Sequence, residues 1–407
     1  MTISPYIDTL VAKSNAAAPI KVCMHVLGSA RTDARVIREA TALAEAGFEL
    51  TIVDVIDEKN WHNEENIRAI RIKHTIISSW YTPTRFKLWF LVKIAWIIIQ
   101  NTVRLIRTPA DIYHAHDEDA LPACYIAALL CRKPLIFDSH ELPFNNPSIA
   151  CRRHLSVLAK RTLTRMLPRC AGVITTSPLY AQEICNQHHY PEVTLVRNFP
   201  TYQAVPKSDR LRQYLGLSSG VRIALYQGNL QPNRSLDVLV HAAPFLESNI
   251  VIVLMGKAVK ATRDLLEGLI VSEGVADRVK MIPPVPYEEL LNWTASADIG
   301  LTIFQPDYTR SIQLCLPNKL FEYLMAGLPV LSSQLDAIAE VIKTYNVGQL
   351  LPSLAPSDIG ATMNAMLADT SALARMRNNA LEAARQEFHW ENERQKLIQL
   401  YHTILAR

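Results

Sequence analysis

Short apolar runs alternate with longer mixed segments along most of the chain. The first run, Lys21 to Leu27, is followed by a segment of helical spacing, Arg35 to Ala46, and then by a second run, Glu49 to Asp54. A strand, a helix and a second strand in this order predict a βαβ unit and a parallel sheet. Further strands are predicted over Ile70 to Ile72, Asp111 to Ala115, Pro134 to Phe137, Gly172 to Thr176 and Thr194 to Val196.

The alternation stops between Asn198 and Gly220, where the sequence becomes polar and irregular, and then begins again. We therefore predict two α/β domains, each a doubly wound parallel sheet whose ligand lies at the carboxyl ends of the strands. The expected division is a loose tail over residues 1–19, domains over 20–205 and 206–386, and a final helical segment over 387–407. Strands of the second domain are predicted over Arg222 to Gln227, Ile250 to Met255, Val279 to Ile282, Ile299 to Ile303 and Val330 to Ser332.

Composition is that of a globular protein of 407 residues, with 49% hydrophobic and 20% charged residues. The net charge of +4 is uneven: through Lys207 there are 24 basic and 18 acidic residues, and after it 18 basic and 20 acidic. This excess is too small and too dispersed for a nucleic-acid partner. The seven cysteines contain no Cys-x-x-Cys pair, which favours free thiols in a reducing cytosol over a disulfide or metal framework.

The most informative segment is Leu316 to Val330. Pro317 and Asn318 can begin a helix, and Gly327 and Pro329 can end it. Lys319 then lies in the first turn, where free N–H groups and the helix dipole favour an anion. Glu322 follows one turn later with a carboxylate suited to a pair of hydroxyls. The segment predicts a site for the diphosphate and ribose of a nucleotide, although an ordinary surface helix has the same pattern.

Polar residues also follow two strands of the first domain. His114 and His116 alternate with apolar residues, so they should lie on one face of their strand, before Asp117-Glu118-Asp119. Paired histidines beside acids are compatible with a metal site. The second group, Asp138-Ser139-His140-Glu141, ends the next strand, and Asp138 is placed to orient His140.

Taken together, these elements resemble a family 4 glycosyltransferase of GT-B architecture from about Lys21 to Leu405. The resemblance implies two Rossmann-like domains facing across a cleft, an acceptor domain followed by a nucleotide-sugar donor domain, with the last helix returning to the first. It argues against a metal, so no cofactor is expected beyond the nucleotide-sugar substrate. The motifs that carry it are Arg31 to Val36, Asp111 to Asp117, Asp138 to Glu141, Tyr226 to Arg234, Pro317 to Gly327 and the helix at Trp390.

The resemblance assigns roles to residues of this chain. Arg234 and Lys319 should hold the diphosphate as charge develops on it, and Glu322 should bond the ribose. His116 should lie beside the donor sugar at the reaction centre. Donor-nucleotide contacts are expected from Gly228, Asn229, Arg234, Pro284, Val285, Asn318, Lys319, Leu320 and Glu322, and sugar or acceptor contacts from Gly28, Ser29, His116, Asp117, His140, Glu141, Gln313 and Leu314.

Two positions depart from the family pattern. Many members carry a glutamate eight positions before Glu322, where this chain has Leu314, and an arginine after the glycine turn, where it has Asn229. Leucine cannot accept a hydroxyl hydrogen bond, so the sugar contacts must come from elsewhere, such as Gln313. Asp33 and Arg35 can equally be a helix cap with its ion pair or part of a ligand site.

The implied reaction is retaining, metal-independent front-face transfer from a nucleotide-diphosphate sugar, more often a UDP-sugar than a GDP-sugar. The expected acceptor is a hydroxyl of a lipid-linked, polysaccharide or other glycoconjugate molecule. A GT-B nucleotide-sugar 2-epimerase and an inactive scaffold remain alternatives. A hydride-transferring dehydrogenase is disfavoured because neither domain opens with Gly-x-Gly-x-x-Gly.

One further helix, Phe86 to Ile99, is apolar nearly all round and contains two tryptophans, but it is too short and too charged to span a bilayer. It is followed, after Cys151, by a basic segment with Arg152, Arg153, Lys160, Arg161, Arg165 and Arg169. Core packing with a solvated basic face is one interpretation; peripheral contact with an anionic membrane, on the inner face of the cytoplasmic membrane, is the other.

Overall fold

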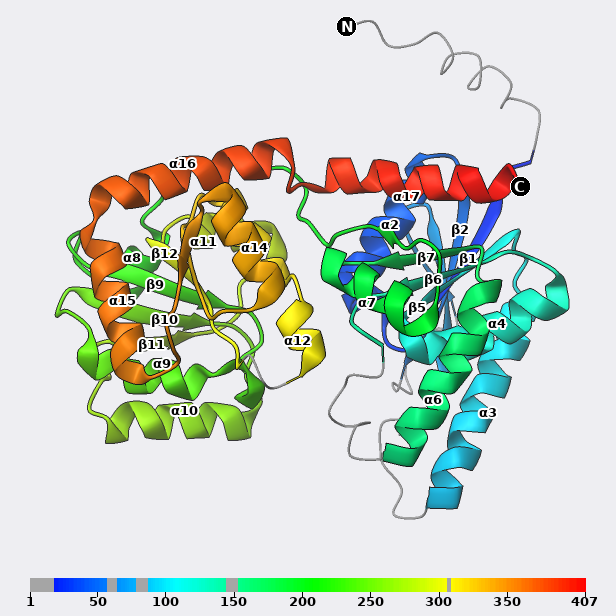
Figure 1. The fold of residues 1–407 in the computed structure, drawn as a ribbon, viewed down its shortest axis with the longest axis horizontal. Coiled ribbons are helices and arrows are strands. Elements are labelled where there is room, and N and C mark those ends of the chain that lie inside the picture. The colour runs from blue at the N-terminus through cyan, green and yellow to red at the C-terminus, as the bar shows by residue number, and fades with distance from the viewer. Residues whose placement is uncertain (1–17, 57–63, 78–86, 144–152, 306–308) are drawn as a thin grey trace, which may run out of the picture. The chain divides into compact units, whose positions relative to one another are not determined.

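The computed structural model describes residues 18–56, 64–77, 87–143, 153–305 and 309–407. They form two compact units, which we call the N-terminal unit (Met1–His140, Arg161–Ile174 and Leu397–Arg407) and the C-terminal unit (Glu141–Lys160 and Thr175–Lys396). Figure 1 shows the elements of each unit. Most of the expected tail, together with Phe86 and Arg152, lies outside the described residues.

The first sheet has eight strands in the order β3-β4-β2-β1-β5-β6-β7-β8. Its central pairs are parallel, whereas β3 pairs antiparallel with β4 at one edge. The strands are β1 (Lys21–Val26), β2 (Glu49–Ile56), β3 (Glu64–Ile67), β4 (Ile70–Ile76), β5 (Ile112–His116), β6 (Leu135–Ser139), β7 (Gly172–Thr175) and β8 (Thr194–Leu195).

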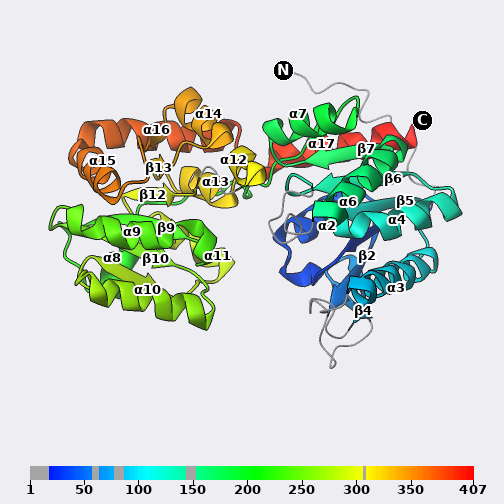
Figure 2. The same ribbon diagram turned by 60° about the horizontal axis from the view of Figure 1, so that its bottom comes forward.

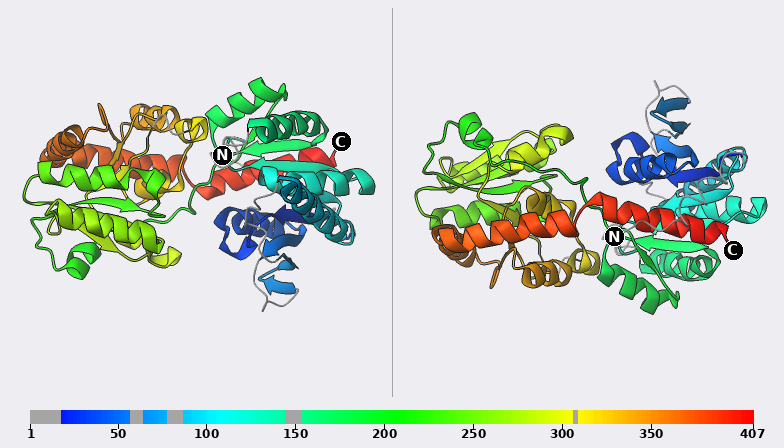
Figure 3. Two further views of the ribbon diagram at one scale, coloured as in Figure 1. Left: turned by 90° about the horizontal axis from the view of Figure 1, so that it is seen from below. Right: turned by 90° about the horizontal axis from the view of Figure 1, so that it is seen from above.

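Helices cover both faces of this sheet, and side chains of β5 show which helices lie on which face. Tyr113 bonds the carbonyl oxygen of Leu105 on α3 and the thiol of Cys131 on α4, whereas His114 bonds Tyr401 on α17. Figures 2 and 3 show the α3–α4 side and the course of α17. The helices are α2 (Ala34–Glu45), α3 (Lys87–Ile106), α4 (Asp117–Cys131), α6 (Arg153–Met166), α7 (Pro178–His188) and α17 (Trp390–Leu405), with 3-10 turns at Ala30–Thr32 and Leu167–Arg169.

The second sheet has six parallel strands in the order β11-β10-β9-β12-β13-β14. They are β9 (Arg222–Gln227), β10 (Ile250–Met255), β11 (Val279–Ile282), β12 (Ile299–Thr302), β13 (Val330–Ser332) and β14 (Gly348–Leu350). The helices are α8 (Arg210–Leu215), α9 (Leu236–Ala242), α10 (Lys260–Ser272), α11 (Tyr287–Thr294), α12 (Arg310–Leu314), α13 (Asn318–Met325), α14 (Asp336–Tyr345), α15 (Pro356–Ala368) and α16 (Thr370–Gln386), with 3-10 turns at Pro232–Arg234 and Ala243–Phe245.

The core of the second sheet is divided between its two faces. Ile223 and Leu225 of β9 belong to one apolar cluster, which includes residues of α11, α13, α14 and α16. Ala224 and Tyr226 of the same strand belong to the other cluster, with residues of α9, α10 and α15. A parallel strand buried on both faces reads as a continuous apolar run, which is why the sequence shows it so clearly.

The predicted α/β class and the two parallel sheets are confirmed, as is the return of the last helix. Leu397–Arg407 belongs to the N-terminal unit, and Leu400 and Ile404 of α17 lie so close to Gly172 that a Cβ there would be 3.1–3.2 Å from them. Three predictions need correction. Strands β3 and β14 were missed because they are short and partly exposed, β3 is antiparallel, and the apolar helix continues beyond Ile99 to Ile106.

Candidate functional site

In the C-terminal unit, helix α13 is anchored to the sheet by Tyr323. The Tyr323 hydroxyl accepts a hydrogen bond from the backbone N–H of Gln227 at 3.0 Å and lies 3.0 Å from the carbonyl oxygen of Leu225 and 3.3 Å from that of Leu301. Room for the ring comes from Gly300, where a Cβ would lie 2.5 Å from ring atoms. This contact fixes α13 at the carboxyl ends of β9 and β12, the edge where parallel α/β sheets bind ligands.

Glu322, the residue before Tyr323 on α13, is held in place by two successive hydrogen bonds. Gln227 is the last residue of β9, and its amide donates to a carboxylate oxygen of Glu322 at 2.6 Å. The hydroxyl of Thr294, at the end of α11, donates to the amide oxygen of Gln227 at 2.7 Å. All three side chains are buried. The carboxylate therefore has a fixed direction, which is the requirement for recognising a pair of hydroxyls.

Two cations lie beside this carboxylate and share an aromatic wall. The Nζ atom of Lys319 is 3.5 Å from the ring centroid of Tyr226 and 5.7 Å from that of Phe304. The guanidinium of Arg234 is 5.1 Å from the same Phe304 ring. Burial, and then the positive charge of Arg234, hold the pKa of Lys319 well below its usual value. Like charges forced together in this way are compensated by a bound anion.

Gly228 brings backbone against Lys319. It has a φ of +122°, a conformation that favours glycine, and a Cβ at this position would lie 3.5 Å from Lys319 Nζ. The neighbouring Asn229 is exposed, and its carbonyl oxygen accepts a hydrogen bond from the Tyr226 hydroxyl at 3.2 Å. The structure therefore brings together four residues that the sequence predicted for the nucleotide: Gly228, Arg234, Lys319 and Glu322.

Other residues predicted for the donor lie differently. Leu320 is fully buried and its N–H is bonded to the carbonyl oxygen of Pro317. Leu314 is also buried, and its carbonyl oxygen accepts a hydrogen bond from the hydroxyl of Ser177 at 2.7 Å. Gln313 accepts from Arg310 at 3.0 Å.

The remaining predicted residues of this unit are near its surface. Asn318 begins α13 and is exposed. Pro284 is exposed and Val285 half-buried, in the loop between β11 and α11. Glu141 is exposed, and its charge, like those of Arg234 and Lys319, acts on the thiol of the half-buried Cys315. Burial is the main reason that the pKa of this thiol is raised to about 12.

In the N-terminal unit, the second group of predicted residues lies where three parallel strands end. Val26 of β1 is in register with His116 of β5, and His116 with Asp138 of β6. Gly28 and Ser29 follow β1, and the Ser29 carbonyl oxygen accepts from the N–H of Thr32. The carboxyl edge of this sheet thus carries Gly28, His116 and Asp138 side by side.

His140 is held between two carboxylates. Its Nδ1 lies 3.1 Å from Asp117 and its Nε2 lies 3.1 Å from Asp138, while its backbone N–H donates to Asp117 at 2.9 Å. Although burial by itself lowers the pKa of His140, the charges of Asp117 and then Asp138 raise it well above its usual value. Asp117 has a φ of +63°, a strained conformation that its bonds to His140 stabilise. The two carboxylates therefore favour the imidazolium form of His140.

His114 and His116 lie on one face of β5, as the alternation predicts, with their rings stacked at 4.3 Å. His116 is 1% exposed, and its Nδ1 is 3.2 Å from Asp138. His114 is bonded through Nδ1 to the Tyr401 hydroxyl at 2.7 Å, and burial followed by the charge of His116 lowers its pKa well below the usual value. It is His140, not His116, that reaches the surface of this group, with 16% of its side chain exposed.

Arg35 supplies a permanent positive charge to this buried group. Its guanidinium donates two hydrogen bonds of 2.8 Å to Asp138 and lies 2.9 Å from Glu39. The helix cap expected of Asp33 is confirmed, because its side chain accepts hydrogen bonds from two backbone N–H groups at the start of α2, whereas Arg35 forms its ion pairs with Asp138 and Glu39. Burial raises the pKa of Glu39 to about 7 against the opposing charge of Arg35.

Four of these side chains offer metal-ligating atoms within 4.8 Å of one another: Glu39, His114, His116 and Asp138. The sequence had placed Asp117 to Asp119 beside the two histidines, but Asp117 pairs with His140 instead. The guanidinium of Arg35 already lies on both carboxylates of the group. A divalent cation would have to share them with this fixed positive charge, so the residues present do not fit a metal site.

Several residues of the two groups had no predicted role. Glu39 had a weak signal, because it lies four positions after Arg35 on an amphipathic helix. Gln227 belongs to the motif from Tyr226 to Arg234, but its position in the sequence gives no indication of the bond to Glu322. Phe304, Thr294 and Tyr401 carry no signal, since each meets its partner only through the tertiary fold.

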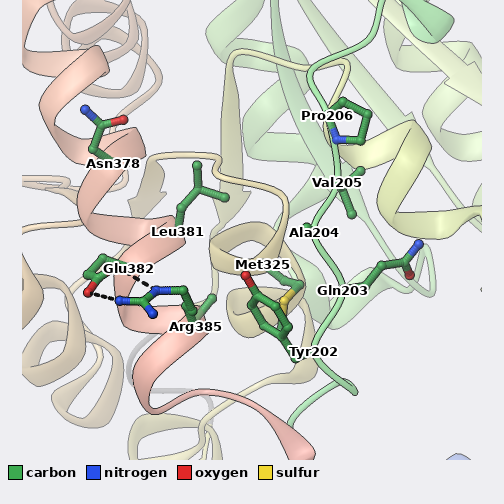
Figure 4. Close-up of a pocket in the computed structure, with 11 residues that line it drawn as sticks. Tyr202, Gln203, Ala204, Val205, Pro206, Met325, Asn378, Leu381, Glu382 and Arg385 are labelled. Atoms are coloured by element: carbon green, nitrogen blue, oxygen red, sulfur yellow. Dashed lines mark hydrogen bonds and ion pairs between the residues drawn. The ribbon is translucent and has the colours of Figure 1, made fainter.

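A separate pocket of about 500 Å³ lies at the other end of α13, around Met325 (Figure 4). The segment Tyr202 to Pro206 forms one wall and α16 forms the other, with the charged pair Glu382–Arg385 at its rim. These two charges satisfy each other, with hydrogen bonds of 3.0 and 2.7 Å. The pocket therefore has no relation to the cations and carboxylate at the beginning of the helix.

The fold is that of the GT-B glycosyltransferases, as comparison with solved structures shows. Sucrose-phosphate synthase from Thermosynechococcus elongatus superposes with a TM-score of 0.77 at 17% identity, over 95% of this chain and 99% of that one. HepE from Anabaena, in complex with UDP and glucose, gives 0.71 at 15% identity, over 94% and 100%.

Family models match both parts of the chain. "Glycosyltransferase Family 4" matches residues 34–199 and "Glycosyl transferases group 1" matches residues 207–383. The chain belongs to glycosyltransferase family 4, a family of sugar-transferring enzymes.

Curated relatives include two D-inositol 3-phosphate glycosyltransferases. That of Thermobispora bispora is 27% identical over 56% of this chain and 54% of the relative, and that of Streptomyces bingchenggensis is 26% identical over 69% and 64%. The chain thus spans about half to two thirds of the length of these relatives.

Proposed function

We propose that this protein transfers a sugar from a UDP-sugar to a hydroxyl group, with retention of the anomeric configuration. One observation carries the proposal: a single edge of the second sheet brings together the Gly228 turn, the cations of Arg234 and Lys319 and the fixed carboxylate of Glu322. Cations suit a diphosphate and a carboxylate suits the two hydroxyls of a ribose. A nucleoside diphosphate has both groups.

In the proposed reaction, the bond between the anomeric carbon and the diphosphate oxygen breaks, and the bond to the acceptor oxygen forms on the same face. The departing phosphate takes the proton of the acceptor hydroxyl, so no protein nucleophile is needed. Lys319 and Arg234 stabilise the negative charge that grows on the phosphate. Because these two side chains supply the positive charge, we propose that the reaction needs no metal.

In the N-terminal unit we propose that His116, Asp117 and His140 serve the sugar or the acceptor. We propose the same role for Glu141, the first residue of the C-terminal unit. Of the two histidines, His140 is the one with exposed surface, and the carboxylates of Asp117 and Asp138 raise its pKa, so it is suited to donate hydrogen bonds to sugar oxygens. His116 lies behind it in contact with Asp138, and its effect on a ligand passes through His140. Gly28 and Ser29 offer backbone groups at the same edge.

The uracil base is supported by the Anabaena relative of the same fold, which was solved with UDP and glucose. For this chain we propose that the base meets the loop of Pro284 and Val285, since this loop leads into α11, whose Thr294 fixes Gln227 and thus Glu322. Leu314 is buried and has no hydrogen-bonding group in its side chain, so the donor sugar must be held by other groups, such as Gln313.

We propose a lipid-linked or polysaccharide acceptor and a place of action at the inner face of the cytoplasmic membrane. The support is the set of apolar side chains that α3 exposes, among them Trp89 and Trp96. In the described part of the chain, the longest apolar helices fall short of what a membrane crossing needs. The contact we propose is therefore peripheral.

Calorimetry with UDP and GDP tests the nucleotide part of the proposal. UDP should bind more tightly than GDP, and Glu322→Ala should weaken UDP binding about tenfold or more, because it removes hydrogen bonds to the ribose. Glu340→Ala, at an exposed position of α14, is the control and should bind UDP like the wild type. Equal affinity of the Glu322 variant would refute the assignment of the site.

Incubation with UDP-sugars tests the reaction. A transferase should give a glycosylated product only with an acceptor extract, with the anomeric configuration of the donor retained by NMR. Conversion of the UDP-sugar alone into its C2 epimer would show the alternative activity of the fold. UDP binding without turnover on a broad donor panel would show a scaffold.

A further inference from the structure

Helix α3 presents a continuous apolar stripe to the surface. Six side chains spaced alternately by three and four residues are each more than a third exposed, and spacing of this kind places them on one face of a helix. Trp89 is 66% exposed and Trp96 is 58% exposed, which is unusual for the largest side chain in a protein. The stripe consists of Trp89, Val92, Trp96, Ile99, Val103 and Ile106.

The opposite face of α3 holds the helix on the N-terminal unit. Ile97, Asn101 and Leu105, spaced by four, are buried, and the carbonyl oxygen of Leu105 accepts a hydrogen bond from the buried Tyr113. From Ile97 to Leu105 the stripe is therefore the outward face of an anchored helix, whereas nearer the start of α3 Leu91 and Ile94 are exposed as well, at 45% and 38%, which widens the apolar surface there. A contiguous apolar surface of this extent indicates an interaction site.

The end of α4 continues this apolar surface. Leu129 and Leu130 are 57% and 65% exposed, and they are followed by the exposed Arg132 and Lys133. Helices α3 and α4 pack on each other and lead into β5 and β6, which are neighbouring parallel strands. The carboxyl ends of the two helices, with Ile106 on α3, therefore lie at the same edge of the sheet.

Basic side chains outnumber acidic ones in the segments beside the apolar surface, although Lys133 is paired with Asp111 at 2.9 Å. Neither α3 nor α6 contains an aspartate or glutamate, and α4 has its acids only in its first turn, at the other end of the helix. Arg161 and Arg165 of α6 are exposed and one helical turn apart. Arg169, which follows, donates a hydrogen bond to Tyr125 of α4 at 2.7 Å, which fixes these arginines beside α4.

The charges decide between two occupants of this surface. In a dimer with two-fold symmetry, the same patch meets itself, so the basic residues of one copy would lie against those of the other. An anionic bilayer complements both properties, because apolar side chains enter its interface and arginines meet its headgroups. We propose that α3 and the end of α4 dock this protein on the surface of an anionic lipid bilayer, with the arginines of α6 on the headgroups.

The docking proposal rests on the proposed function only in taking the acceptor to be held at a membrane. It goes further in assigning the contact to one face of the N-terminal unit. Because α3 belongs to this unit and the nucleotide-binding residues belong to the other, lipid binding and UDP binding can be measured separately.

Flotation with vesicles tests the proposal on the full chain. The wild type should float with vesicles of phosphatidylglycerol and phosphatidylcholine, and far less with phosphatidylcholine alone. Trp96→Glu should reduce the bound fraction about tenfold or more, because a carboxylate opposes insertion and meets anionic lipid. Val271→Glu adds the same charge at a side chain 75% exposed on α10 of the other unit and should bind like the wild type.

The electrostatic part has its own pair of variants. Arg165→Gln should weaken binding about fivefold and reduce its dependence on salt, since one basic residue near a charged membrane surface contributes to that extent. Arg375→Gln, exposed on α16 of the C-terminal unit, should leave binding unchanged. Circular dichroism and thermal melting verify that each variant is folded.

The outcomes separate the two proposals. Vesicle binding by Trp96→Glu equal to that of the wild type, or no flotation of the wild type at low salt, would overturn the docking surface. A dimer in light scattering that Trp96→Glu converts to a monomer would overturn it in favour of a second copy. If the wild type floats with the vesicles and Trp96→Glu does not, the docking proposal is supported even when calorimetry shows no UDP binding. In that case only the proposed function fails.

Discussion

The hydrogen bond between Gln227 and Glu322 gives the sharpest test of how this site is built. Gln227→Leu keeps the size of the side chain but removes the amide. The carboxylate of Glu322 then loses the 2.6 Å bond from the amide nitrogen, and the Thr294 hydroxyl loses its acceptor at 2.7 Å. Thr294 also lies 2.8 Å from the carbonyl oxygen of Leu290, so its hydroxyl keeps a partner in the variant.

The magnitude follows from the burial of these groups. A hydrogen bond to a charged group contributes about 1.5–3 kcal/mol and a neutral one about 0.5–1.5 kcal/mol. Since Glu322 is only 9% exposed, solvent compensates little of the loss. We expect Gln227→Leu to lower the free energy of unfolding by about 2–4 kcal/mol. We also expect about tenfold weaker UDP binding, because the carboxylate no longer has a fixed direction.

Urea unfolding gives the change in stability, and calorimetry gives the affinity for UDP. Thr294→Val keeps the bond between Gln227 and Glu322 and should cost about 1 kcal/mol of stability with little effect on UDP binding. Gln203→Leu, at an exposed position in the same unit, is the control and should match the wild type.

A double-mutant cycle of Gln227→Leu with Glu322→Ala separates positioning from general damage. If Gln227 acts through Glu322, its replacement should have almost no further effect on UDP binding once Glu322 is gone. Full additivity of the two losses in binding energy would refute the reasoning.

Three further predictions concern other parts of the two units. UDP binding should take up protons, because the pKa of Lys319 is lowered in the free protein and a bound anion raises it. The affinity for UDP should therefore fall as pH rises through the lowered pKa. Calorimetry in buffers of different ionisation enthalpy detects the proton uptake, and equal heats in all buffers would contradict it. Gly300→Ala should cost about 1–3 kcal/mol of stability, since its Cβ would meet the Tyr323 ring at 2.5 Å. Gly268→Ala, which has open space on α10, should instead stabilise the protein by about 0.5–1 kcal/mol. Loss of stability in both variants would show that the ring contact is not the cause. Arg35→Met should cost about 3–5 kcal/mol because it removes the guanidinium that donates two hydrogen bonds to the buried Asp138. The exposed Arg385→Met should cost much less; thermal unfolding is the measurement, and equal costs would refute the reasoning.

The sequence was sufficient for the class of fold because the evidence is local. Strands such as Ile250–Met255 are continuous apolar runs, and a parallel strand buried on both faces requires such a run wherever it lies. The same holds for α13, because Pro317 and Gly327 mark its beginning and its end. Strand β3 was missed for the converse reason: its burial alternates, it is half exposed, and its antiparallel pairing with β4 depends on a turn.

The candidate site divides in the same way. The sequence picked out Lys319 and Glu322 from the predicted start of a helix and His140 from the end of a predicted strand, and the family resemblance added Arg234. It did not pick out the residues that hold them, because these partners are distant in the sequence: Gln227 lies 95 positions from Glu322 and Tyr401 lies 287 positions from His114.

The exposure of α3 was also left open by the sequence, which showed an apolar helix but not which of its faces would be covered. By itself the chain determined its alternation of strands and helices and the places where polar groups end them, since these depend on the chemistry of neighbouring residues. The tertiary structure decided which carboxylate Gln227 fixes, which acids Arg35 satisfies and which face of α3 stays outside. Such contacts depend on packing between elements, and packing is a property of the whole fold.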